Sequence, residues 1–168
     1  MAMALEWNDA RLRKETAMIA PRAALGASMV YHGLGKLKGE APRKTGEMFD
    51  KVGLQPGKPL AVLAGVAEVF AGVGAILGFW TRPAALAVLV TQAVAISKIH
   101  GKNGFDVTKG GCEYNLTLMA IAAGLLVAGP GLFSTHEGIE RLAEGRGVKR
   151  LYRKARPSGL LRFIKALK

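Results

Sequence analysis

The sequence predicts an all-α integral membrane protein: a four-transmembrane-helix bundle with a basic, partly amphipathic C-terminal tail. Half of its 168 residues are apolar, and its mean hydropathy is +0.21. The charge is unevenly placed, because ten of the 24 Lys and Arg residues lie from Arg141 onward. From Leu60 to Val90, by contrast, only Glu68 and Arg82 are charged. Apolar blocks between basic flanks are typical of membrane proteins.

Four apolar blocks, each about 20 residues long, are long enough to cross a hydrocarbon core of about 30 Å. The expected helices cover residues 17–34, 59–80, 83–99 and 114–132. Small residues spaced four apart, such as Ala61 with Gly65, favour close helix packing in lipid. The predicted organisation is an N-terminal tail (1–16), a membrane domain (17–134) and a basic tail (135–168), with polar loops over 36–58 and 101–111.

The distribution of Lys and Arg predicts the orientation. If both tails and Arg82 lie on one side, that side carries 14 of these residues and the other side carries nine. Because positive residues accumulate on the cytoplasmic side, we expect both termini in the cytoplasm. In the tail, Arg162, Lys165 and Lys168 recur every three residues opposite an apolar face. This pattern predicts an interfacial helix that binds anionic lipid headgroups.

Other partner and cofactor classes have weaker support. The net charge of +12 would suit nucleic acid, but no nucleic-acid-binding motif accompanies it, so no such partner is expected. Cys112 is the only cysteine, which excludes an internal disulfide and a CxxC redox pair.

Polar residues inside apolar segments are costly in lipid and therefore point to a site. In the proposed topology, each helix places one ionisable side chain in the outer half of the bundle. The candidate catalytic residues are Glu68, His32, His100 and Glu113. The candidate cofactor-binding residues beside them are Tyr31, Gln92, Lys98 and Asn115.

Three interpretations of this cluster are open. The first is a quinone pocket, in which His and carboxylate side chains exchange protons with the two carbonyl oxygens. The second is a metal site, but the Glu-x-x-His pairs of di-iron bundles are absent, so no metal ligands are predicted. The third is structural, with ion pairs such as Glu68–Arg22 or Glu113–Lys98.

The chain resembles the DoxX family of small bacterial and archaeal membrane proteins. The resemblance lies in motifs whose order and spacing agree from about Arg22 to Ser134. They are Arg22-x-x-x-Gly26, Tyr31-His32-Gly33-x-x-Lys36, Gly65-x-x-Glu68, Leu77-Gly78-x-x-Thr81-Arg82, Gly110-Gly111-x-Glu113 and Gly129-Pro130-Gly131 followed by Ser134.

The resemblance implies a four-helix fold in the cytoplasmic membrane of a bacterium or archaeon. It also implies a link to quinol oxidase and thiosulfate:quinone oxidoreductase complexes. We therefore expect the protein to be a small membrane subunit of a redox complex. It would bind quinone and contact partner subunits. The alternative is a non-catalytic subunit that anchors or stabilises a larger membrane complex.

Overall fold

The computed structural model describes residues 16–131 and 134–135, so most of both expected tails lies outside it. The described residues form helices and no strand. The main helices are α2 (Ile19–Leu37), α3 (Ala41–Lys51), α4 (Gly57–Leu77), α5 (Thr81–Ala95) and α6 (Glu113–Ala128). A π-helical segment, η1 (Ile96–His100), and two 3-10 turns, η2 (Gly101–Asn103) and η3 (Val107–Lys109), connect α5 to α6. The expected all-α architecture is confirmed.

Helix α3 was not predicted, because its segment carries many charges and was expected to be a polar loop. Local interactions explain it. A proline stands in the first turn, where its missing N–H is harmless. Arg43 pairs with Glu40 and Glu47, three residues before it and four after it, on the exposed face of the helix. Phe49 is buried and attaches the helix to the rest of the molecule.

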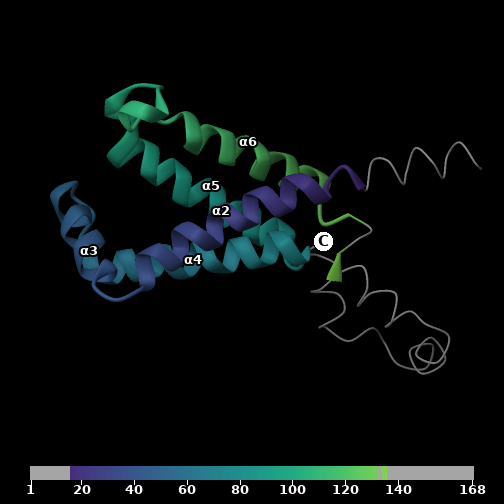
Figure 1. The fold of residues 1–168 in the computed structure, drawn as a ribbon, viewed down its shortest axis with the longest axis horizontal. Helices are drawn as coiled ribbons and strands as arrows, with labels where there is room; N and C mark the ends of the chain where they lie inside the picture. Colours follow the sequence, from purple (N-terminus) through teal and green to yellow (C-terminus); the bar gives the residue numbers. More distant parts are fainter. Residues whose placement is uncertain (1–15, 132–133, 136–168) are drawn as a thin grey trace, which may run out of the picture.

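The long helices form two pairs, with α2 beside α4 and α5 beside α6 (Figure 1). The pairs meet along α4 and α5, which a tight turn connects. In that turn, Gly78 and Trp80 both adopt the left-handed conformation, with φ of 65° and 50°. The pairs diverge toward the end that carries α3 and the α5–α6 connection (Figure 1).

Glycines allow α2 and α4 to approach closely along their length. A Cβ atom at Gly72 would lie 2.6 Å from the backbone oxygen of Gly26, and one at Gly33 would lie 2.7 Å from that of Gly65. Such distances are shorter than van der Waals contact. The two helices therefore pack backbone against backbone, as helices do where lipid removes the hydrophobic drive for association.

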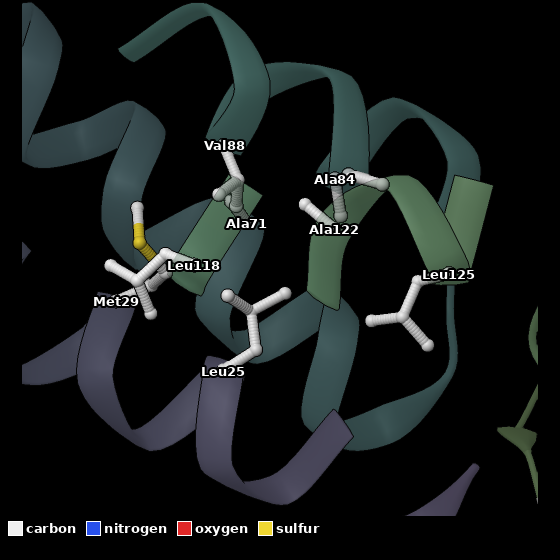
Figure 2. Packing of buried hydrophobic residues seen from close by; sticks show 9 residues of the cluster. Leu25, Met29, Ala71, Ala84, Val88, Leu118, Ala122 and Leu125 are labelled. Atoms are coloured by element: carbon white, nitrogen blue, oxygen red, sulfur yellow. The ribbon is translucent and has the colours of Figure 1, made fainter. Parts of the chain in front are cut away.

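The apolar core lies where all four long helices meet. Side chains from α2, α4, α5 and α6 point toward one another in Figure 2. Leu25, Met29, Val88, Leu118 and Leu125 fill the centre, and alanines of α4, α5 and α6 occupy the narrow places between them. Small and large residues alternate, which lets the layers interdigitate.

Among the described residues, two helical segments are long and apolar enough to cross a membrane, namely Gly57–Leu77 and Thr81–Asn103. Only 39% and 22% of their most apolar windows are buried, so most of their apolar side chains face outward. A core helix of a water-soluble protein would be mostly buried. The outward side chains, such as Leu63 at 63% exposure and Val90 at 61%, suit contact with lipid.

We predict that Gly72→Ala separates α2 from α4. The added methyl group meets the backbone of Gly26, and such overpacking costs about 1–3 kcal/mol of folding free energy. Thermal unfolding in detergent measures the loss. Gly124→Ala is the matched control, because nothing lies within 4 Å of a Cβ atom there. Equal melting temperatures for the Gly72 and Gly124 variants would contradict the close α2–α4 contact.

Candidate functional site

An ion pair with a buried carboxylate joins α2 to the middle of α4. Lys36 Nζ lies 2.6 Å from Glu68 Oε2, and the two side chains are 24% and 7% exposed. A carboxylate at this depth is costly unless a cation or a hydrogen-bond donor meets it. Lys36 supplies both. The partner of Glu68 is thus Lys36, rather than Arg22 as one interpretation of the sequence proposed.

Lys36 reaches Glu68 because α2 is longer than expected. The helix continues through Gly33 and Gly35 to Leu37, whereas the apolar block ends at Leu34. Lys36 consequently stands one turn after His32, and its Nζ also lies 3.5 Å from the backbone oxygen of His32. The four-residue spacing of His32 and Lys36 indicated a helix that continues with both side chains on one face, but Lys36 was assigned to the polar loop.

Aromatic rings surround His32 on the exposed side of this ion pair. The His32 ring is 5.5 Å from that of Tyr31 and 5.6 Å from that of Tyr114, at the start of α6. All three residues are exposed, Tyr31 by 76%. The contact between His32 and Tyr114 connects the two helix pairs. A planar, partly polar molecule could stack on such rings.

A second polar pair lies deeper, between α5 and α6. Asn115 Nδ2 donates a 2.7 Å hydrogen bond to Gln92 Oε1, and both side chains are 6% exposed. Gln92 Nε2 in turn faces the sulfur of Met29 at 3.9 Å. Met29 stands one turn before His32 on α2. The amide pair is therefore next to the aromatic cluster, in the same half of the bundle.

The other predicted residues have local roles in the α5–α6 connection. His100 Nδ1 lies 2.8 Å from the backbone oxygen of Gly110, and the Glu113 carboxylate accepts a hydrogen bond from the Val107 N–H at 3.3 Å. Glu113 therefore stabilises the loop instead of pairing with Lys98, which is exposed. Hydrogen bonds from Thr108 hold the same loop and lower the pKa of Asp106.

Arg22 has a different role, at the far end of α4. Its guanidinium donates to the backbone oxygens of Ala75 (2.9 Å), Ile76 (2.8 Å) and Pro130 (2.8 Å). The side chain is buried, with 4% of the residue exposed. Gly78 leaves the necessary room, because a Cβ atom there would meet the guanidinium. Arg22 therefore joins α2 to the ends of α4 and α6.

Of the eight predicted site residues, Glu68, His32, Tyr31, Gln92 and Asn115 thus line one region. We call this region, together with Lys36, Tyr114 and Met29, the outer polar cluster, because the topology expected from the sequence places it in the outer half of the bundle. It combines an ammonium, a carboxylate and an imidazole with two phenols and two amides, so it can donate, accept and transfer protons. In the described part of the chain, no three His, Cys, Asp or Glu residues are arranged to hold a metal ion.

Comparison with known proteins identifies one family. The DoxX family model matches residues 17–101, just over half of the chain. The match covers α2 to α5 and thus includes Lys36, Glu68 and Gln92 of the outer polar cluster, while Tyr114 and Asn115 lie beyond it. No curated protein and no solved structure matches.

We predict an asymmetric response when the Lys36–Glu68 pair is broken. Lys36→Met leaves an unpaired carboxylate that is 7% exposed, and loss of one partner of a buried pair costs about 3–5 kcal/mol. Glu68→Gln should cost less, because the flexible Lys36 stem can extend toward water. The double variant should recover most of the loss.

Thermal unfolding of the four proteins in detergent provides the double-mutant cycle. Arg43→Met is the control, since it breaks two ion pairs on the exposed face of α3 and should change the melting temperature little. Additive effects of the Lys36 and Glu68 substitutions would show that the two side chains do not interact.

Proposed function

The chain belongs to the DoxX family of membrane proteins, and from this premise we propose that it is a small membrane subunit of a redox complex that binds quinone at the outer polar cluster. The observation that carries the proposal is the position of the Lys36–Glu68 pair one helical turn from His32, whose backbone oxygen lies 3.5 Å from Lys36 Nζ and whose side chain is exposed. Charged groups and a titratable ring rarely share a site within apolar helices without a functional reason.

The side chains of the cluster fit the chemistry of a quinone. Such a molecule offers two carbonyl oxygens, which accept protons as electrons arrive, on a planar ring. The Lys36 ammonium can donate a hydrogen bond to one oxygen while Glu68 balances its charge. The His32 imidazole can donate or accept a proton at its ring nitrogens. Tyr31 and Tyr114 offer ring surfaces and hydroxyl groups.

A non-catalytic anchoring or stabilising subunit is the second candidate. It is favoured by the completeness of the Lys36–Glu68 pair, which leaves neither charge unpartnered before any ligand binds. Outward apolar side chains on α4 and α5 would in that case contact the subunits that the protein stabilises. Both candidates place the chain in a larger membrane complex.

In this proposal all four long helices span the cytoplasmic membrane of a bacterium or archaeon. The backbone contacts between Gly26 and Gly72 and between Gly33 and Gly65 place α2 beside the candidate span α4 for most of its length. The Gln92–Asn115 bond similarly places α6 beside the second candidate span. An even number of spans puts both termini on one side, which Lys and Arg counts assign to the cytoplasm.

Glu68→Gln and His32→Gln should each lower quinol-linked activity of the parent complex about 100-fold, the usual contribution of a general acid or base. Both amides approximate the shape of the native side chain but cannot exchange the proton. Glu47→Gln is the control, because it makes the same carboxylate-to-amide change on the exposed face of α3, outside the cluster. The measurement is the quinol oxidation rate per assembled complex.

The two candidate functions differ in this experiment. Loss of assembled complex in Glu68→Gln, with an unchanged rate per complex, would support the anchoring subunit instead. Full assembly together with full activity in both variants would refute a proton-transfer role for the cluster. Binding of a soluble short-chain quinone to the purified subunit, measured by equilibrium dialysis, gives an independent test of the same site.

The topology can be read from Cys112, a partly exposed free thiol directly before α6. With cytoplasmic termini, this residue lies on the outer side of the membrane. A membrane-impermeant maleimide should therefore label it in intact spheroplasts. Labelling that requires lysis would invert the orientation, provided that a denatured sample confirms that the thiol is reactive.

A further inference from the structure

A shallow apolar groove follows the outward face of α4. Its volume is about 370 Å³, and every residue that lines it is aliphatic, phenylalanine or glycine. Val66, Phe70, Val73 and Leu77 recur at helical spacing along its floor and are 42–51% exposed. The groove lies on the opposite side of α4 from the buried Glu68, so it is separate from the outer polar cluster.

The dimensions of the groove match one leaflet of a bilayer. Val66 and Leu77 are eleven residues apart, which corresponds to about 16 Å along a helix. Half of a hydrocarbon core is about 15 Å thick. Because α4 and the segment after it are the two candidate spans, the turn between them must lie at a membrane surface. The groove thus extends from that surface toward the bilayer centre.

Aromatic and basic side chains surround the surface end of the groove. Phe79, which lines the groove, stacks on Trp80 with ring centres 5.5 Å apart, and Phe70 meets Trp80 edge-on at 6.0 Å. Tryptophan is enriched at the level of lipid headgroups. Arg82 follows two residues later, is exposed, and forms no ion pair with any described residue. Residues 57–97 contain Glu68 as their only acid, and Lys36 already pairs with it.

We propose that this groove is a binding site for an anionic phospholipid. One acyl chain lies along Val66, Phe70, Val73 and Leu77, and the phosphate lies at the α4–α5 turn, where Arg82 is the charged group available to it. The apolar lining and the leaflet-long floor select the acyl chain, while the exposed cation Arg82, which pairs with no described acid, selects the negative headgroup. The site does not depend on quinone binding, because it uses neither the residues nor the face of the outer polar cluster.

Native mass spectrometry of the full chain in mild detergent tests the proposal. The protein is mixed with equal amounts of phosphatidylglycerol and phosphatidylcholine, and the bound lipids are counted. Wild type should retain phosphatidylglycerol preferentially. Arg82→Gln should reduce that preference about five-fold, as expected for one Lys or Arg near anionic lipid. Val73→Trp should fill the groove and remove most retained lipid.

Matched controls separate this site from general effects. Lys102→Gln removes an exposed cation at the other end of the same span, and Val90→Trp enlarges an outward residue on α5 that is 61% exposed. Both should bind lipid as wild type does. An unchanged headgroup preference in Arg82→Gln, or unchanged retention in Val73→Trp, would overturn the proposal. A change from a dimer to a monomer in Val73→Trp would also overturn it, because the groove would then bind a second copy of the chain.

Discussion

The described bundle depends on the buried guanidinium of Arg22. The last backbone oxygens of a helix have no partner within that helix, and leaving them unbonded in an apolar environment is costly. Arg22 satisfies Ala75 and Ile76 at the end of α4 and Pro130 after α6 with one planar group. Its charge also suits the negative end of the α4 dipole. One side chain therefore fixes the order of three helices.

Polar contacts and small residues then stabilise the bundle in different ways. Between the level of Arg22 and that of the outer polar cluster, α2 and α4 meet through glycine backbones, which specify distance but not partner identity. Lys36–Glu68 connects α2 to α4, and Gln92–Asn115 connects α5 to α6. Because a buried polar group without a partner is costly, each pair favours the helix register in which its two members meet. Beyond this level the two helix pairs diverge (Figure 1). His32 of one pair and Tyr114 of the other remain in ring contact, and both residues are exposed.

The sequence predicted the long helices because their apolar blocks are longer than ordinary loops. It also predicted Glu68, Gln92 and Asn115 as site residues, because they are polar residues inside these apolar blocks. It missed α3, because the charged residues that pair on its exposed face are also common in loops. Lys36 was missed because two glycines suggested an earlier end of α2, although packing against α4 keeps the helix regular. His100 and Glu113 looked like site residues, but hydrogen bonding within a glycine-rich loop is not visible as a sequence pattern.

The Lys36–Glu68 pair has a consequence for biogenesis. Insertion of α4 alone would carry a bare carboxylate into the centre of the bilayer, and an acidic residue there costs about 2.5–3.5 kcal/mol on insertion scales. The ammonium that neutralises it is synthesised 32 residues earlier, at the end of the preceding long helix. In the proposed four-span topology, α2 and α4 would enter together as a hairpin whose internal charges are already balanced. The cation is thus synthesised before the carboxylate that it must neutralise.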